Sequence, residues 1–187
     1  ALLTGATGFL GSRLLVELLN STDSYKTIYA LVRAASEEEA SERISMTALK
    51  YLPFEAKQRI LKAIQEKRII LLPGDVSQDK LGLSAAVYER LSTEIDQVLH
   101  LAATVNMILP FEKLKAANFD GTLNIAEFAF NSKFKSLHYA STLSVFVSTD
   151  KNHGVLKESD RLDDTKEIYG GYAQTKWLAE KALLELQ

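Results

Sequence analysis

A tyrosine and a lysine four residues apart, Tyr172 and Lys176, stand in a segment with helical spacing of apolar residues near the end of the 187-residue chain. Residues at positions i and i+4 share one face of a helix, so the phenol and the ammonium are expected to be neighbours. A tyrosine has an ordinary pKa of about 10, and an adjacent positive charge lowers that pKa by favouring the phenolate. The pair could therefore donate a proton to an oxygen atom, with Tyr172 as the acid.

A second chemical signal comes from three glycines near the start of the chain, Gly5, Gly8 and Gly11. They follow a short apolar run and open a segment whose leucines recur at helical spacing, which is typical of a strand, a tight turn and a helix. The N–H groups and the positive dipole end at a helix N-terminus bind phosphate once glycines let the backbone approach. The spacing differs from G-x-G-x-x-G, so a tight strand-to-helix turn without a ligand is the alternative.

The next apolar strand, 27–32, ends at Arg33, where NAD-specific enzymes commonly carry an acidic residue for the ribose hydroxyls. A guanidinium can instead bind a 2′-phosphate through a planar set of donors. Arg13, just inside the first helix, could reach the same group. These residues favour NADPH as the cofactor; the alternative is that Arg33 is a solvated charge at the end of a strand.

Composition sets further limits. Hydrophobic residues make up 47% of the chain, which suits one domain with a substantial core. A net charge of -2 without a basic cluster gives no indication of nucleic acid or an anionic membrane as a partner. The chain has no cysteine, which excludes disulfides, thiolate catalysis and zinc–thiolate sites and favours a cytoplasmic location. The apolar stretch 98–111 is too short and too polar to span a bilayer.

The histidines give no indication of a metal site, because no carboxylate stands at ligand spacing from them. His100 and His138 lie in apolar strand patterns, so we expect both rings to be buried as packing residues.

Strand and helix patterns alternate along the whole chain. Five apolar segments are expected to form strands, at 1–3, 27–32, 68–72, 97–102 and 136–140. Such alternation predicts an α/β fold, a Rossmann-like doubly wound parallel sheet with helices on both faces. The charged segment 36–67 is predicted to form two helices that separate near Pro53 and turn a charged face to solvent. We therefore expect one nucleotide-binding domain over residues 1–187.

In such sheets, ligands bind beyond the carboxyl ends of the strands, so the residues that follow each strand are candidates. Asp75 follows the third strand and could accept a hydrogen bond from an adenine amino group or cap the next helix. Ala102 and Ala103 at the fourth strand are small enough to let a cofactor lie against the backbone. Thr142 follows the fifth strand and brings a hydroxyl to the crevice.

Taken in chain order, the glycine turn, Arg33, Thr142 and the Tyr172–Lys176 pair resemble the extended short-chain dehydrogenase/reductase family. More narrowly, the chain resembles the thioester reductase branch of that family. This branch includes the terminal reductase domains of non-ribosomal peptide and polyketide synthases, carboxylic acid reductases and alpha-aminoadipate reductase. The narrower resemblance rests on three segments: His100-Leu101-Ala102-Ala103-Thr104-Val105-Asn106, Leu114-Lys115-Ala116-Ala117-Asn118 and Gly170-Gly171-Tyr172-Ala173-Gln174-Thr175-Lys176-Trp177.

The resemblance implies two sets of site residues. The implied catalytic residues are Thr142, Tyr172, Lys176 and Asn118, of which Asn118 would support the lysine through a water. The implied cofactor-binding residues are Thr4, Gly5, Thr7, Gly8, Phe9, Leu10, Gly11, Arg13, Arg33, Asp75, Val76, Ala102, Ala103, Tyr172 and Lys176.

The reaction that the resemblance implies is reduction of an acyl or peptidyl thioester by NADPH. The partner would be a phosphopantetheinylated carrier protein within a larger multidomain polypeptide, and the product an aldehyde that a second round could convert to an alcohol. Family members continue into a smaller substrate domain, whereas this sequence stops at Gln187. We therefore expect the substrate domain to be largely missing, and the 187 residues to bind NADPH but to reduce thioesters poorly.

Three alternatives remain open from the sequence. A sugar-nucleotide epimerase or dehydratase shares the glycine turn and the Tyr–Lys pair but commonly retains NAD. An alcohol-forming fatty acyl-CoA reductase would accept free CoA thioesters. A non-catalytic NADPH-binding module would have no need of a proton donor such as Tyr172.

Overall fold

The computed structural model describes residues 1–21, 25–146, 155, 157, 160, 162 and 168–186. Its sheet has five strands, all parallel, in the order β3-β2-β1-β4-β5. The strands are β1 (Leu2–Thr4), β2 (Ile28–Val32), β3 (Ile69–Pro73), β4 (Gln97–His100) and β5 (Ser136–Tyr139). The order reverses at β1, so the crevice beyond the ends of β1 and β4 is the expected ligand position.

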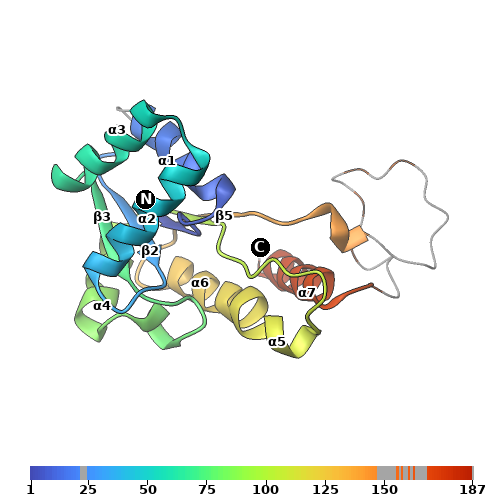
Figure 1. Cartoon of the computed structure of the whole chain (residues 1–187). Coiled ribbons are helices and arrows are strands. Elements are labelled where there is room, and N and C mark those ends of the chain that lie inside the picture. The colour runs from blue at the N-terminus through green and yellow to red at the C-terminus, as the bar shows by residue number, and fades with distance from the viewer. Residues whose placement is uncertain are drawn as a thin grey trace.

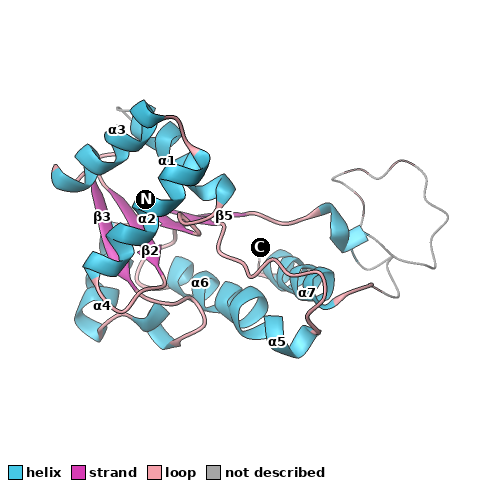
Figure 2. Cartoon of the chain, in the orientation of Figure 1, coloured by secondary structure: helices cyan, strands magenta, loops and turns pink. Residues whose placement is uncertain are grey.

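Helices cover both faces of this sheet (Figures 1 and 2). The α-helices are α1 (Phe9–Asn20), α2 (Glu37–Tyr51), α3 (Phe54–Gln65), α4 (Ala85–Glu94), α5 (Phe111–Lys115), α6 (Gly121–Phe130) and α7 (Gly171–Glu185). Shorter helical segments are η1 (Asp79–Gly82), η2 (Ala116–Asp120) and η3 (Leu143–Phe146). Helices α1, α2 and α3 pack on one face of the sheet, and α4 and α6 pack on the other. This arrangement is the Rossmann-like fold that the sequence predicts.

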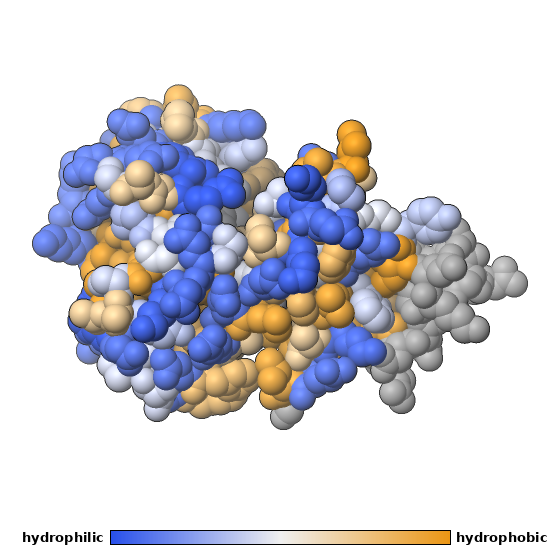
Figure 3. Space-filling model, turned by 90° about the horizontal axis from the view of Figure 1, so that it is seen from below, coloured by the Kyte–Doolittle hydropathy of each residue, from blue (hydrophilic) through white to orange (hydrophobic). Residues whose placement is uncertain are grey.

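The apolar runs of the strands explain the two-sided core. Neighbouring residues of β1 enter different hydrophobic clusters: Leu3 packs with α1, α2 and α3, whereas Leu2 packs with α4 and α6. Side chains alternate between the two faces of a strand, so a run without polar residues is what a sheet buried on both faces requires. On the face seen in Figure 3, hydrophilic and hydrophobic residues are interspersed, and the hydrophobic ones gather in several small patches.

The predicted pair of helices between β2 and β3 is confirmed. Ser36 caps α2 by accepting a hydrogen bond from the Glu39 N–H at 3.3 Å, and three glutamates occupy the first turn, where the helix dipole favours negative charge. The helix stops before Pro53, which directly precedes α3. A proline cannot continue the hydrogen-bond ladder of a helix, so it separates the two segments.

Two details differ from the expectation. Strand β4 ends at His100 rather than at residue 102, because the next two amides bond to a side chain instead of a strand. His138 is exposed rather than buried, because β5 forms an edge of the described sheet and turns this ring outward. Within the described residues, no helix is long and apolar enough to span a membrane.

Candidate active site

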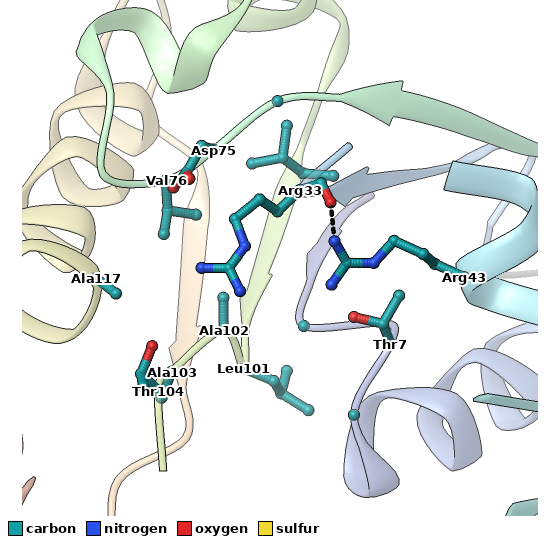
Figure 4. A pocket seen from close by; sticks show the side chains of 14 residues that line it. Thr7, Arg33, Arg43, Asp75, Val76, Leu101, Ala102, Ala103, Thr104 and Ala117 are labelled. Atoms are coloured by element: carbon teal, nitrogen blue, oxygen red, sulfur yellow. Dashed lines mark hydrogen bonds between the residues drawn. The ribbon is translucent and has the colours of Figure 1, made fainter. Parts of the chain in front are cut away.

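A cleft of about 220 Å³ lies beyond the carboxyl ends of β1, β2, β3 and β4 (Figure 4). Its walls come from the segments that follow these four strands, from Leu31 near the end of β2, from Arg43 on α2 and from Ala117 in η2. The lining residues are Gly5, Thr7, Gly8, Leu31, Arg33, Arg43, Gly74, Asp75, Val76, Leu101, Ala102, Ala103, Thr104 and Ala117. The structure thus brings together most of the cofactor-binding residues expected from the sequence.

The glycine turn forms one wall of the cleft, and two of its glycines, Gly5 and Gly11, leave no room for a side chain. Gly5 has a φ of +75°, and a Cβ on it would lie 2.6 Å from the carbonyl carbon of Leu101. A Cβ on Gly11 would overlap the carbonyl oxygen of Gly5. The Gly8 N–H donates to the Gly5 carbonyl at 2.9 Å and closes the turn directly before α1. The backbone can therefore come close to a ligand here.

The N-terminus of α1 is open at this turn. Gly8 is the N-cap, and no side chain caps the first turn of the helix. The first N–H groups of an α-helix have no partner within the helix, and together with the dipole they form an anion site. The exposed Phe9 and Leu10 follow immediately. The cradle and its donors fit the pyrophosphate of a dinucleotide.

Two guanidinium groups reach the cleft from the side of β2. Arg33 directly follows β2, and its side chain points into the middle of the cleft (Figure 4). Arg43 comes from α2, donates a hydrogen bond to the Arg33 carbonyl oxygen and also lines the cleft. Sequence reasoning missed Arg43 because it stands on a helix whose charged face was assigned to solvent. Its place on the helix that follows the Arg33 strand is the signal that could have found it.

Arg13 lies elsewhere. Its guanidinium donates to the carbonyl oxygen of Tyr51 at 3.3 Å, and its carbon Cζ lies 4.9 Å from the ring centroid of Phe9. It is not among the residues that line the cleft. The structure therefore pairs Arg33 with Arg43 at the cleft rather than with Arg13.

Asp75 and Val76 stand on the opposite side of the cleft (Figure 4). The Oδ1 atom of Asp75 accepts from both the N–H and the hydroxyl of Ser77, at 2.9 and 2.7 Å. This bond pattern closes an Asx turn after β3. The next helical segment, η1, has Gln78 as its N-cap and no side-chain cap, so Asp75 does not have the capping role considered from the sequence. The position in the cleft is also compatible with an adenine contact through the remaining carboxylate oxygen.

A buried histidine, His100, lies at the end of β4, next to the cleft. His100 is fully buried, and burial lowers its pKa to about 3, so the ring is neutral. The hydroxyl of Thr122 donates to the Asn118 carbonyl at 2.6 Å and is therefore the acceptor for His100 Nε2–H at 3.1 Å. The Nδ1 atom then accepts from the Thr4 hydroxyl at 2.8 Å. The hydrogen-bond network assigns the Nε2–H tautomer.

Thr4 connects His100 to the wall of the cleft by hydrogen bonds. It is fully buried and does not line the cleft, although it was expected among the cofactor-binding residues. Its Oγ1 accepts from the N–H groups of Leu101 and Ala102, at 3.2 and 3.0 Å. These two amides belong to the segment that Gly5 also touches. Thr4 therefore fixes the small-residue wall of the cleft rather than touching its contents.

Asn118 connects this wall to the helix of the Tyr–Lys pair. It is buried in η2, a π-helical turn, and such turns frequently occur at functional sites. Its Oδ1 accepts from the Thr104 N–H at 2.7 Å, and its Nδ2 donates to the Thr104 carbonyl at 3.1 Å. The same Nδ2 lies 3.1 Å from the Thr175 hydroxyl, which donates to the Tyr172 carbonyl at 2.8 Å. Asn118 thus joins the segment after β4 to α7.

Tyr172 and Lys176 lie on the buried face of α7. The Lys176 ammonium donates to the Ala140 carbonyl at 2.6 Å, and burial lowers its pKa to about 8. Burial raises the pKa of Tyr172, in contrast to the lowering expected from a neighbouring ammonium. The difference has a geometric cause, because the ammonium is directed at the end of β5.

Thr142 stands two residues beyond the carbonyl that Lys176 binds. Its hydroxyl accepts from the Ser144 N–H at 3.3 Å and so supports the start of η3. Helix α7 packs against η3, which keeps Thr142 near the helix that carries Tyr172. Within the described part of the chain, no group of three or more His, Asp or Glu residues could hold a metal ion.

Comparison with known proteins gives consistent results. Residues 3–187 match the NAD-binding family described as "Male sterility protein". The chain is 40% identical to a linear gramicidin synthase polypeptide of Brevibacillus parabrevis over 181 residues, which are 96% of this chain and 3% of that protein. It is 33% identical to carboxylic acid reductase of Mycobacterium tuberculosis, over 98% of this chain and 16% of that protein.

A solved structure agrees with these sequence matches. The terminal R domain from the myxalamid PKS-NRPS biosynthetic pathway superposes with a TM-score of 0.85 at 42% identity, covering 98% of this chain and 44% of that one. The chain therefore spans only part of each relative. The matched family binds a nicotinamide dinucleotide, and the cleft has the cradle that such a cofactor needs. The chain belongs to this NAD-binding family and, within the extended short-chain dehydrogenases/reductases, to the thioester reductase branch.

Proposed function

We propose that this chain is the NADPH-binding part of a reductase that acts on acyl or peptidyl thioesters and releases an aldehyde. The observation that carries the cofactor choice is the pair of guanidiniums, Arg33 and Arg43, at the β2 side of the glycine cleft. Two fixed positive charges there would bind a 2′-phosphate, which NADH lacks. The glycine turn would hold the pyrophosphate, and Ala102 and Ala103 would lie against the middle of the cofactor.

The substrate class is inferred from the relatives. One relative belongs to a gramicidin synthase and another is a carboxylic acid reductase, and the chain covers only a small part of each. The resemblance to the thioester reductase branch implies that such large polypeptides hold their intermediates as thioesters on carrier domains. We infer that the thioester is presented on the phosphopantetheine arm of a carrier protein, within a longer polypeptide that supplies the rest of the substrate pocket.

The proposed chemistry assigns a role to each residue of the second set. When bound in the cleft, the cofactor would supply the hydride that reduces the carbonyl carbon of the thioester. Thr142 and Tyr172 donate hydrogen bonds to the carbonyl oxygen, and Tyr172 transfers its proton to that oxygen as negative charge develops. The hydroxyl proton of the resulting hemithioacetal returns to the Tyr172 phenolate as the C–S bond breaks, and the departing sulfur takes a proton from solvent, which gives a thiol and an aldehyde.

Lys176 and Asn118 would position the cofactor and Tyr172 and would not contact the bond that breaks. Lys176 would hold the nicotinamide ribose, while its ammonium is directed at the end of β5 rather than at the phenol of Tyr172. Asn118 holds the position of α7 through Thr175, so it would keep Tyr172 at a fixed distance from the cleft. A buried tyrosine with a raised pKa remains protonated at neutral pH, which suits a proton donor.

The test is NADPH oxidation by the longer parent polypeptide, with an acyl-pantetheine thioester as substrate. Oxidation should require the thioester, prefer NADPH over NADH and fall about a thousandfold in Tyr172→Phe. Tyr169→Phe is a matched control, because Tyr169 is 65% exposed and lies three residues earlier. Retention of most activity in Tyr172→Phe would refute the assignment of the acid. Tightly bound NAD without thioester reduction would instead support an epimerase or dehydratase.

A further inference from the structure

The Lys176 ammonium makes two contacts with the end of β5, and only one of them is a hydrogen bond. Its Nζ atom donates to the Ala140 carbonyl at 2.6 Å. The same atom lies 3.9 Å from the ring centroid of Tyr139, the residue directly before Ala140. A cation over an aromatic face at this distance is attracted by the negative face of the ring. Lys176 is 2% exposed, so water does not screen this attraction.

The Tyr139 ring is itself held in place. Tyr139 pairs with His100 in the register of β4 and β5, and the two rings stack with centroids 5.7 Å apart and planes 26° apart. His100 is fixed in turn by its hydrogen bonds with Thr4 and Thr122. A column of ordered groups therefore runs from the centre of the sheet to the lysine.

The hydroxyl of Tyr139 does not take part in this arrangement. Its oxygen is buried and has no hydrogen-bond partner among the residues that the structure describes. A buried hydroxyl without a partner costs free energy relative to a phenylalanine at the same place. What this position contributes is the aromatic face.

We propose that Tyr139 is a positioning residue for Lys176, whose ring holds the ammonium in its charged form at the end of β5. The inference deepens the proposed function and rests on it for the role of Lys176 toward the cofactor. Loss of the ring would remove a cation–π attraction without removing the Ala140 hydrogen bond.

The groups that face Lys176 decide the direction of the effect. Burial lowers its pKa, and Glu180, one turn later on α7, raises it. His100 on β4 is neutral, and burial raises the pKa of both Tyr139 and Tyr172, so both phenols are protonated. The Tyr139 ring adds an attraction for the cation that none of the other neutral groups replaces. Removal of the ring should therefore lower the pKa of Lys176 further, by about one unit.

The experiment compares Tyr139→Phe, Tyr139→Leu and Tyr139→Met with the wild type in the full-length polypeptide. NADPH affinity, followed by cofactor fluorescence, and kcat/KM for an acyl-pantetheine thioester are measured from about pH 6 to about pH 10. Both should decline on the alkaline side as Lys176 loses its proton, and Lys176→Met should abolish this decline in affinity. We expect the midpoint to shift by about one pH unit toward acid in the Leu and Met variants and to stay in place in the Phe variant.

The controls separate the possible outcomes. The two aliphatic variants, Leu and Met, differ in shape. If one of them misfolds, which is seen as lost NADPH affinity at the acidic end of the range, the midpoint of the other still tests the proposal. Unchanged midpoints in the aliphatic variants overturn the proposal, as does an equal shift in Tyr139→Phe, since the hydroxyl would then be responsible. If the NADPH-binding midpoint shifts in the Leu and Met variants although the wild type reduces no thioester, that result supports the role of Tyr139 and refutes the proposed function.

Discussion

Asn118 binds Thr104 through both halves of its side-chain amide, with distances of 2.7 Å to the N–H and 3.1 Å from Nδ2 to the carbonyl. The side-chain amide satisfies both backbone groups of Thr104, as a neighbouring strand would, and so fixes the backbone of the segment after β4. It also ties the segment after β4 to α7 through Thr175. This one amide group thus contributes directly to the relative position of the cleft and Tyr172.

Replacement of Asn118 by alanine should destabilise the chain by about 2 kcal/mol, because two partly buried backbone groups of Thr104 would lose their partners. Asn106→Ala is the matched control. Its Oδ1 accepts from the N–H groups of Ile108 and Leu109, both at 2.9 Å, in an exposed turn, so its loss should cost about 1 kcal/mol. Urea unfolding measures both values. Equal costs would mean that the amide of Asn118 is no more than a turn cap.

The glycines of the turn should separate folding from binding. Gly11→Ala places a Cβ into the Gly5 carbonyl and should destabilise the chain by about 3 kcal/mol. A Cβ on Gly8 would lie 3.3 Å from the Gly5 oxygen, so Gly8→Ala should fold with a smaller cost and lose about tenfold in NADPH affinity by blocking the approach of the pyrophosphate. Thermal unfolding and cofactor titration distinguish the two. Undiminished affinity in Gly8→Ala would argue against a phosphate site at this turn.

The two guanidiniums should set the choice of cofactor. The double variant Arg33→Ser/Arg43→Ser should lose about a hundredfold in NADPH affinity and leave NADH affinity unchanged, because charge-assisted hydrogen bonds to the 2′-phosphate are removed. Arg13→Ser is the control, since Arg13 bonds to Tyr51 outside the cleft. Titration with both cofactors gives the ratio. If Arg13→Ser lowers NADPH affinity as strongly as the double variant does, the sequence-based expectation for Arg13 holds and the role given to Arg43 is wrong.

His100 should make the chain sensitive to mild acid. Its pKa is about 3 in the folded chain and about 6.5 when unfolded, so the unfolded state binds an extra proton between these values and stability falls as the pH drops below 6.5. From about pH 7 to about pH 5 the loss is about 2 kcal/mol, and above this range the group adds little pH dependence.

His100→Asn should reduce that acid sensitivity, since asparagine does not titrate. His138→Asn is the control, because it applies the same substitution to an exposed histidine. Urea midpoints at about pH 5 and about pH 7 in the three proteins provide the comparison. The same acid sensitivity in wild type and His100→Asn would show that the buried imidazole is not the responsible group.

Much of the fold could be predicted from the sequence, because buried parallel strands are continuous apolar runs and the turn has a steric requirement for glycine at Gly5 and Gly11. The expected strands and the break at Pro53 follow from such local rules. Arg43 was not predicted, because its approach to Arg33 depends on how α2 packs on the sheet. The π-helical turn at Asn118 was missed for a related reason, since it is stabilised by contacts with Thr104 and Thr175, which are 14 and 57 residues away.

Among the site residues, too, some features follow from local sequence and others from tertiary packing. Tyr172 and Lys176 share a helix, which their spacing predicts. The direction of the Lys176 side chain toward β5 is a property of the packed structure, and it explains why the pKa of Tyr172 is not lowered as expected.

The strand order has a consequence for how this chain is built during synthesis. Strand β1 pairs with β2, which begins at Ile28, but also with β4, where Leu2 lies opposite Val98. Residues 1–73 can assemble β1, β2 and β3 with their helices while the ribosome is still making the rest. The other edge of β1 stays unpaired until β4 has been synthesised. At ordinary elongation rates, this delay lasts several seconds. The cleft, whose walls come from both halves, completes only when β4 has joined, so cofactor present during translation would stabilise the last step of assembly rather than the first.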